Sequence, residues 1–174
     1  MEKILIVVDM QEDFISGPLG TPEARDIVPN VVQKCIEARQ AFDTIIFTKD
    51  LHYKEDYFDD LEGKYVPPHC MANQNGHWII PELQPYTDFW ATKSTYGYQF
   101  WGDWNNIFKD AEIIELVGVC TDICVISNAL LLRGIYPNIP IVVDASCCAG
   151  SIPERHKAAL GVMKSCNITI INEV

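Results

Sequence analysis

Basic residues are scarce in this chain of 174 residues. Thirteen Lys and Arg stand against 24 Asp and Glu, which gives a formal net charge of −11. Nucleic acids and anionic membrane surfaces repel such a chain, and no cluster of basic residues offsets the charge. Neither nucleic acid nor a membrane surface is therefore expected as a partner.

Long apolar runs are also missing. Only five successive apolar residues precede Asp9, too few for the apolar part of a signal peptide. No run approaches the roughly 20 residues that a membrane-spanning helix needs. Hydrophobic residues nevertheless make up 48% of the chain, enough to fill a core. We expect a soluble, cytoplasmic protein with a single domain over residues 1–174.

The cysteines lack the even, regular spacing of a disulfide framework. There are seven: Cys35, Cys70, Cys120, Cys124, Cys147, Cys148 and Cys166. In a chain without an export signal, this pattern indicates reduced thiols. The adjacent pair Cys147 and Cys148 is expected in the core, because free cysteine usually behaves as a small hydrophobic residue.

Apolar runs alternate with helical patterns along the chain. The predicted strands are residues 4–8, 44–48, 89–92, 112–118, 139–143 and 168–171. The predicted helices are residues 23–42, 104–109, 121–134 and 153–164. Strands that alternate with helices predict an α/β fold with three layers, in which helices cover both faces of a six-stranded, mainly parallel sheet. Residues 49–80 form a long connection, and such loops tend to be functional.

The clearest local signal lies at residues 112–134. An apolar run up to Gly118 predicts a strand, and the pattern from Thr121 to Gly134 predicts a helix that Thr121 caps. Cys124 would lie in the first helical turn, where free N–H groups and the helix dipole stabilise a thiolate. A strand, a tight turn and a helix commonly present a nucleophile in this way.

Residues with reactive side chains follow the ends of three predicted strands. Asp9 follows the first strand, Lys93 the third and Cys124 the fourth. Parallel sheets place ligand sites beyond these ends, where a carboxylate could take the thiol proton and an ammonium could stabilise the negative charge. Taken singly, the aspartate could cap the next turn, the lysine could be a surface residue, and the cysteine could belong to the core.

A second polar group belongs to the long connection. Asp50 and His52 follow the second strand, while Glu62 and His69 return from the same loop. Imidazole and carboxylate ligands suit Zn, Mn or Fe(II), and the lack of cysteine ligands favours an open site over a structural zinc. The alternative is that these histidines are ordinary surface residues.

Aromatic side chains gather near the same strand ends. The candidates for holding a flat ring are Phe14, Tyr96, Tyr98, Phe100 and Trp101. Stacking could hold a heterocycle in an apolar cleft, or these rings could simply cover the edge of the sheet. The two remaining histidines, His77 and His156, are expected on the surface.

Four motifs span nearly the whole chain. They are Val8-Asp9-Met10-Gln11-Glu12-Asp13-Phe14, Thr48-Lys49-Asp50-Leu51-His52, Pro67-Pro68-His69-Cys70 and Gly118-Val119-Cys120-Thr121-Asp122-Ile123-Cys124-Val125. In order and spacing they resemble the isochorismatase-like cysteine hydrolases, and most of all the nicotinamidase/pyrazinamidase branch. The resemblance implies a catalytic triad of Asp9, Lys93 and Cys124.

The resemblance also implies the surroundings of that triad. A cis peptide bond at Val119–Cys120 and backbone N–H groups of Cys120 and Cys124 would form an oxyanion hole. One divalent metal ion, zinc first and Mn or Fe as alternatives, would be bound by Asp50, His52, Glu62 and His69. The implied substrate contacts are Phe14, Tyr96, Phe100, Asp122 and Ile123.

Two positions depart from the family's pattern. Val66 stands where some members carry an aromatic ring, so this wall of the substrate site is either missing or supplied by Tyr65. Cys120 adds a second thiol next to the nucleophile. The first departure bears on the substrate, whereas the second leaves the triad intact.

The implied activity is hydrolysis of nicotinamide, or of a similar small aromatic carboxamide, to the acid and ammonia through a thioester, as in NAD salvage. One alternative is a hydrolase of the same family that acts on a ureido or carbamoyl compound. Another is a non-catalytic binding or redox-sensing protein that uses its thiols. A homo-oligomer is possible on the family pattern, and no surface patch in the sequence decides it.

Overall fold

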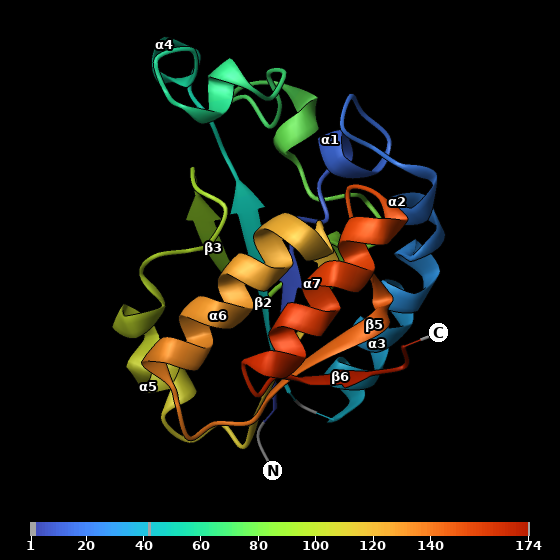
Figure 1. Ribbon diagram of the computed structural model, residues 1–174, viewed down its shortest axis with the longest axis vertical. Coiled ribbons are helices and arrows are strands. Elements are labelled where there is room, and N and C mark those ends of the chain that lie inside the picture. Colours follow the sequence, from blue (N-terminus) through green and yellow to red (C-terminus); the bar gives the residue numbers. More distant parts are fainter. Residues whose placement is uncertain (1–2, 42, 174) are drawn as a thin grey trace.

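The computed structural model describes residues 3–41 and 43–173 (Figure 1). Six strands form one sheet in the order β3-β2-β1-β4-β5-β6, and every neighbouring pair is parallel. The strands are β1 (Lys3–Val8), β2 (Thr44–Asp50), β3 (Phe89–Lys93), β4 (Ile113–Val119), β5 (Ile141–Ala149) and β6 (Thr169–Ile171). The predicted fold class and the six predicted strands are confirmed.

Seven α-helices and several single turns connect these strands. The helices are α1 (Glu12–Ile15), α2 (Pro22–Asp26), α3 (Val28–Ala41), α4 (Lys54–Tyr57), α5 (Asn105–Phe108), α6 (Ile126–Ile135) and α7 (Pro153–Ser165). The 3-10 turns are η1 (Glu62–Lys64), η2 (Asn75–His77), η3 (Gln84–Tyr86) and η4 (Trp101–Trp104), and η5 (Thr121–Val125) is a π-helical turn. Among the described residues, no helix has both the length and the apolar character needed to cross a membrane.

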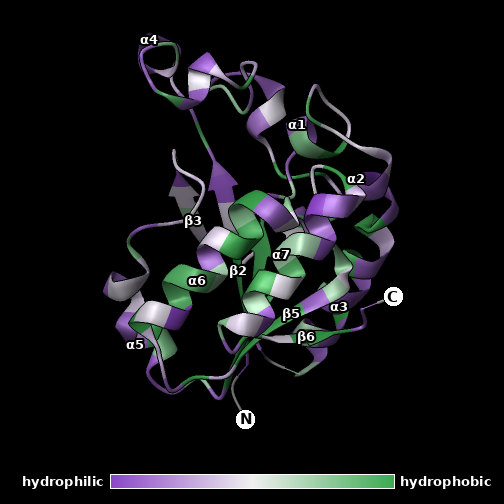
Figure 2. Ribbon diagram, viewed as in Figure 1, coloured by the Kyte–Doolittle hydropathy of each residue, from purple (hydrophilic) through white to green (hydrophobic). Residues whose placement is uncertain are grey.

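The sheet is buried on both faces, which explains its uninterrupted apolar strands. Ile4, Ile6 and Val8 of β1 pack in one core with α6 and α7, whereas Leu5 and Val7 pack in a second core with α3. Successive side chains of a strand point to opposite faces, so each face needs its own apolar set. Figure 2 shows hydrophobic residues along the central strands, while the segment around α4 is largely hydrophilic.

The helix predicted over residues 23–42 is wrong in its extent. It is divided into α2 and α3, with Ile27 between them, and residue 42 lies outside the described residues. Pro29 has no N–H and its ring would clash with the carbonyl four residues earlier, so one continuous helix is not possible here. Thr21 caps α2 instead, because its hydroxyl accepts a hydrogen bond from the Ala24 N–H at 3.0 Å.

Other boundaries also differ from the prediction. β5 continues past residue 143 to Ala149, so that Asp144 lies inside the strand rather than after it. Cys147 and Cys148 are buried in β5, as predicted. His77 is buried rather than on the surface, because the Gln74 carbonyl is within hydrogen-bond distance of its ring and Trp78 packs against it.

Two carboxylates are buried in the sheet on the α3 side. Glu115 of β4 and Asp144 of β5 both contact Lys34 of α3, whose Nζ lies 2.8 and 2.7 Å from their oxygens. Burial acts against the charge of Lys34, but these hydrogen bonds outweigh it and raise its pKa. Burial likewise acts against the Asp144 carboxylate, yet the hydrogen bond from Lys34 holds its pKa below the ordinary value.

We expect Lys34→Met to lower the free energy of unfolding by about 3–5 kcal/mol at pH 7, because it leaves buried carboxylates without their cation. The contribution of Asp144 is present above its unfolded-state pKa of about 3.9 and is lost as the pH falls. The difference from wild type should therefore shrink as the pH falls below about 4 in urea denaturation. Lys3→Met, which removes a half-exposed ammonium 3.4 Å from Glu115, should cost less than about 1 kcal/mol. Equal losses in the two variants would contradict this assignment.

Candidate active site

Three of the predicted residues meet beyond the carboxyl ends of β1, β3 and β4. The ammonium of Lys93 lies 2.7 Å from Asp9 Oδ2 and 3.8 Å from Cys124 Sγ. Asp9 has no exposed surface, and both of its neighbours are buried as well. Lys93 is thus neither solvated nor isolated, and the three side chains form one cluster at the edge of the sheet.

The backbone around Asp9 is shaped to place its carboxylate. Asp9 has φ of +48°, a left-handed conformation that aspartate tolerates better than most residues. Its N–H donates to Thr48 Oγ1 at 3.1 Å, and the Thr48 hydroxyl donates back to Asp9 Oδ1 at 2.6 Å. Gly118 on the neighbouring strand has φ of +115°, and a Cβ there would lie 2.2 Å from the Val8 carbonyl oxygen. Only glycine therefore fits beside the aspartate.

The charges of the cluster differ from the prediction of a stabilised thiolate. Burial raises the pKa of Cys124 well above its ordinary value; Lys93 opposes this rise, and the negative charges of Asp9 and Asp50 reinforce it. Burial also raises the pKa of Asp9, against the effect of Lys93. Burial opposes the charge of Lys93, but the neighbouring negative groups outweigh it and raise the lysine pKa. The resting cluster is therefore a neutral thiol beside a lysine–aspartate pair.

The turn that carries Cys124 is π-helical, not the start of a capped α-helix. The Cys120 carbonyl accepts hydrogen bonds from the N–H groups of Ile123 at 3.0 Å and Val125 at 3.1 Å. The peptide bond Val119–Cys120 is cis, as the resemblance implied. The Thr121 side chain makes no capping bond to this turn, and α6 begins only after it and includes Gly134. The prediction of Thr121 as a helix cap is wrong.

A second cluster lies next to the first. Asp50 Oδ2 is 3.0 Å from His52 Nε2 and 3.2 Å from His69 Nε2, and the three side chains could hold one metal ion. Glu62 is more distant, with Oε1 3.7 Å from His69 Nε2. Lys93 Nζ lies 3.5 Å from Asp50 Oδ1 and so links the two clusters.

The surroundings of His69 fit a cation. Nδ1 lies 2.9 Å from the Pro67 carbonyl, which can only accept, so this nitrogen carries a proton. Nε2 faces the carboxylate of Asp50; burial acts against a charge on the ring, but this contact outweighs it and raises the pKa of His69. A positive charge is therefore stabilised between the two side chains, as the second ring proton or as a metal ion, and imidazole and carboxylate are ligands that Zn²⁺ accepts.

Gln11 is a buried residue of this site that the sequence interpretation missed. Its amide nitrogen donates to the carbonyls of Asp50 at 2.7 Å and His77 at 2.8 Å, and its oxygen accepts from the Asp50 N–H at 2.7 Å. The side chain pairs with the Asp50 backbone much as a neighbouring strand would. A buried polar residue inside the first motif was the available signal.

A cavity of about 260 Å³ lies between the two clusters. Its lining includes Cys124 and Cys120 as well as Asp50, Glu62 and His69. The apolar lining includes Phe14, Leu19, Val66, Tyr96 and Ile123. The predicted contacts Phe14, Tyr96 and Ile123 thus line one space together with the thiol and the metal-type ligands.

Phe100 and Asp122 do not line this cavity. The ring of Phe100 is 52% exposed and packs on Tyr98, and the carboxylate of Asp122 accepts hydrogen bonds from Ser151 N–H and Oγ at 2.7 and 2.6 Å. Tyr65 is 81% exposed and also stands outside it, so Val66 alone forms that part of the wall. The predicted substitution of Tyr65 for a missing ring is not seen.

Part of the aromatic group has a structural role. The Asn128 side chain accepts hydrogen bonds from the Tyr98 N–H and from Trp101 Nε1, both at 2.9 Å, and donates to the Cys124 carbonyl at 2.8 Å. Trp101 is fully buried. These rings cover the edge of the sheet, the alternative that the sequence left open, and they support the turn from behind.

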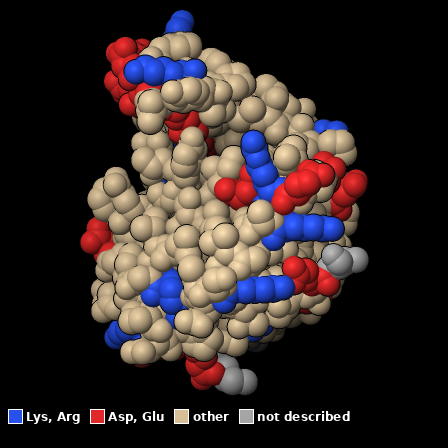
Figure 3. Space-filling model, viewed as in Figure 1, with Lys and Arg blue, Asp and Glu red and all other residues tan. Residues whose placement is uncertain are grey.

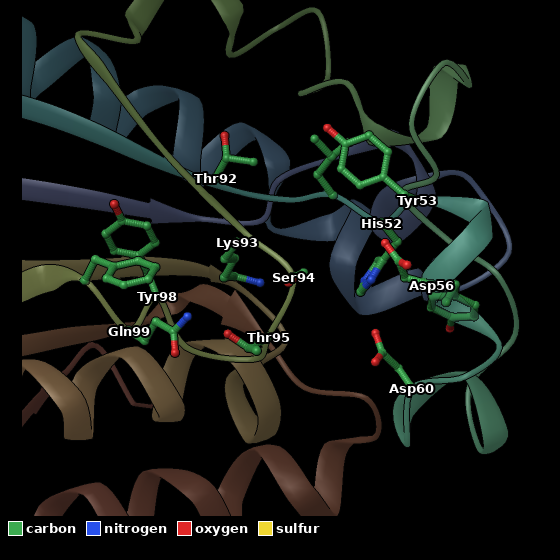
Figure 4. Close-up of a pocket in the computed structure, with 13 residues that line it drawn as sticks. His52, Tyr53, Asp56, Asp60, Thr92, Lys93, Ser94, Thr95, Tyr98 and Gln99 are labelled. Carbon is green, nitrogen blue, oxygen red and sulfur yellow. The ribbon is translucent and has the colours of Figure 1, made fainter.

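A second cavity, of about 340 Å³, reaches His52 and Lys93 from another side (Figure 4). Asp56 and Asp60 approach it from the segment around α4, and Thr95 approaches it from the segment after β3. Phe100 belongs to the lining of this second cavity. Figure 3 shows the segment around α4 overhanging a cleft, with acidic side chains on it.

A parallel α/β sheet whose carboxyl edge carries a buried thiol, a carboxylate and an ammonium has the architecture of a cysteine hydrolase. Residues 3–173 match the model of the isochorismatase domain, and the chain belongs to the isochorismatase family. The family predicted from the four motifs is confirmed, and with it the prediction of a hydrolase.

Known proteins resemble the chain over nearly its full length. It is 26% identical to a nicotinamidase of Schizosaccharomyces pombe, over 97% of this chain and 92% of that protein. A pyrazinamidase of Pyrococcus horikoshii, solved in complex with zinc, is 27% identical with a TM-score of 0.84, over 99% of this chain and 100% of that one. An N-carbamoylsarcosine amidase of Thermoplasma acidophilum is 28% identical with a TM-score of 0.81, over 100% of this chain and 99% of that one.

The raised pKa of Cys124 predicts how its thiol reacts. Alkylation by iodoacetamide, followed at this residue by mass spectrometry, should be slow at pH 7 and should accelerate up to pH 10, because the thiolate is the reactive form. Lys93→Met removes the charge that opposes the rise, so alkylation should become slower at each pH. Lys49 lies against Trp78 and Trp90, away from the thiol. Lys49→Met is therefore the matched control, and it should leave the alkylation rate unchanged. Faster alkylation in Lys93→Met would contradict the charge assignment.

Proposed function

We propose that the protein hydrolyses small aromatic carboxamides, nicotinamide first among them, to the carboxylic acid and ammonia. The observation that carries the proposal is that one cavity is lined by Cys124 together with Asp50 and His69, two members of the group that could hold a metal ion. The relatives named nicotinamidase and pyrazinamidase support the amide C–N bond as the bond that is broken.

The size and lining of the cavity support a small, uncharged substrate. About 260 Å³ is below the usual range of pockets for drug-sized ligands, and suits one ring with its amide. Among the described residues that line it, none is Lys or Arg. Lys93 lies behind the wall and is paired with Asp9. No lysine or arginine of this lining is available to pair with a substrate carboxylate, which favours nicotinamide over N-carbamoylsarcosine.

In the first half of the reaction, Asp9 takes the proton of the Cys124 thiol and the sulfur attacks the amide carbon. The raised pKa of Asp9 makes this carboxylate a stronger base than usual. The N–H groups of Cys120 and Cys124 stabilise the oxyanion. Asp9 then gives the proton to the departing ammonia, and a thioester on Cys124 remains.

In the second half, a water molecule attacks the thioester. Asp9 accepts a proton from this water and returns it to the sulfur as the acid leaves, so that the thiol is regenerated. Lys93 stays protonated throughout and compensates the charge that moves between carboxylate and sulfur. Its closeness to both groups explains how one lysine can serve both halves of the reaction.

Asp50, His52 and His69 would hold one divalent metal ion, with Glu62 as a further ligand after a small movement of its side chain. When bound, such an ion supplies a coordination position for a ring nitrogen or a water molecule. Zinc is the first candidate, because the pyrazinamidase of Pyrococcus horikoshii is in complex with zinc, and Mn or Fe would suit the same ligands.

The activity is tested by ammonia release from nicotinamide, pyrazinamide and N-carbamoylsarcosine. We expect turnover of the first two, and a loss of at least about a thousandfold in Cys124→Ala, because the nucleophile is removed. Cys166→Ala, at a half-buried free cysteine outside the site, should keep the wild-type rate. Release from N-carbamoylsarcosine alone would favour the second candidate substrate. A reactive Cys124 without turnover of any amide would favour a thiol sensor.

The metal site is tested by zinc binding to protein stripped with a chelator. Isothermal titration should give one ion per chain, and His69→Asn should weaken binding by more than about tenfold, because it removes a directly coordinating nitrogen. Asp56→Asn, an acidic residue of the neighbouring cavity, is the control and should bind as the wild type does. Equal affinity of His69→Asn and wild type would rule out this ligand set.

A further inference from the structure

Side chains tie the turn that carries Cys124 to α7 and the loop before it. Thr121 Oγ1 lies 2.8 Å from Nδ1 of His156, in the first helical turns of α7. The next residue, Asp122, is held by the N–H and hydroxyl of Ser151. Two successive residues of the turn are therefore anchored in one segment, 30 residues or so further along the chain and outside the triad.

The backbone hydrogen bonds of the turn do not involve the Thr121 side chain, which is held by a residue outside the turn. β4 ends at Val119 and α6 begins at Ile126, and within this interval the N–H groups of Ile123 and Val125 converge on the Cys120 carbonyl. Thr121 is fully buried, and its hydroxyl lies within hydrogen-bond distance of the imidazole of His156. A buried hydroxyl that loses its partner destabilises the fold, because no water replaces the missing hydrogen bond, so this bond matters to the turn.

Thr121 lies between the two N–H groups on which the proposed reaction depends. Cys120 directly precedes it, and Cys124 follows three residues later. Stabilisation of an oxyanion requires its donors within about 2.7–3.1 Å of the developing charge. A displacement of about 1 Å can cost a hundredfold in rate. A residue that fixes Thr121 therefore fixes the geometry of both donors.

The position of His156 is itself closely defined. Its N–H donates to the Ile152 carbonyl at 3.0 Å, and a Cβ at Gly150 would lie 2.8 Å from the His156 Cβ. Burial lowers the pKa of His156. The charges of Asp122 and Glu173 oppose this effect, whereas the charge of Lys157 adds to it, and the ring is neutral at pH 7. The loop can approach the backbone of α7 at His156 this closely only because residue 150 is glycine.

We infer that His156 is a positioning residue, which acts through its Nδ1–Thr121 hydrogen bond to hold the Cys120–Cys124 turn in its reactive geometry. It touches neither the thiol nor the apolar walls that would hold the substrate ring. Its loss should therefore lower kcat with little change in KM. The effect on turnover rests on the proposed function, whereas the effect on the turn does not.

Three substitutions of His156 distinguish the effect of its hydrogen bond from the effect of its side-chain volume. His156→Asn keeps a polar atom bonded to Cγ, where Nδ1 is, and should retain most of the wild-type kcat. His156→Gln moves the amide one bond further out, and His156→Leu removes it. Both should lose about ten- to a hundredfold in kcat with KM within about threefold of wild type. Lys157→Gln, the next residue of the same helix, should change neither constant.

Hydrogen exchange of the peptide that covers residues 119–126 gives a readout that needs no substrate. Exchange should be faster in His156→Leu and His156→Gln, and unchanged in His156→Asn. Thr121→Val, which removes the hydroxyl but keeps the shape, should reproduce the leucine variant and serves if that variant does not fold. Wild-type kcat and exchange in the leucine or valine variant, or equal losses in the asparagine and leucine variants, would overturn the inference. Faster exchange in a protein whose wild type releases no ammonia would instead count against the proposed function alone.

Discussion

One buried ammonium connects everything that is reactive in this protein. Lys93 Nζ lies within 4 Å of Asp9, Asp50 and Cys124, and no water-exposed ion could replace it there. Buried carboxylates are tolerated only when a cation compensates them. The lysine therefore allows two acids and a thiol to share one dry site, and it joins the nucleophile to the candidate metal ligands. The register of the sheet brings these groups together, because Asp50 of β2 is the direct partner of Lys93 in β3.

The elements that depend on local pattern could be predicted from the sequence. The central strands could be predicted because they are apolar on both faces, and the reactive residues could be placed at one edge because parallel strands end there. The helix predicted over residues 23–42 is too long because the apolar period continues through Pro29, which ends one helix and lies in the first turn of the next. The division into two helices follows from the proline ring, a local cause that was present in the sequence.

The features that were missed depend on partners distant in the chain. Thr121 looks like a helix cap until α7 places His156 beside it. The spacing of Phe100 predicts a substrate contact, but the residue lines the neighbouring cavity instead. The protonation of Cys124 follows from burial and two carboxylates, and no spacing in the sequence reports on either. Gln11 was overlooked because its role is to pair with a backbone, which side-chain chemistry does not suggest.

Lys93 is the last residue of β3, and β3 is an outer strand, joined to the sheet only through β2. Strands at the margin of a sheet open locally at lower free energy than the strands they flank. Local opening of β3 would take the ammonium away from Asp9 and Asp50, and would remove Ala91 from the core on the α6 side. The charge balance of the whole site thus depends on how firmly one border strand stays paired with β2.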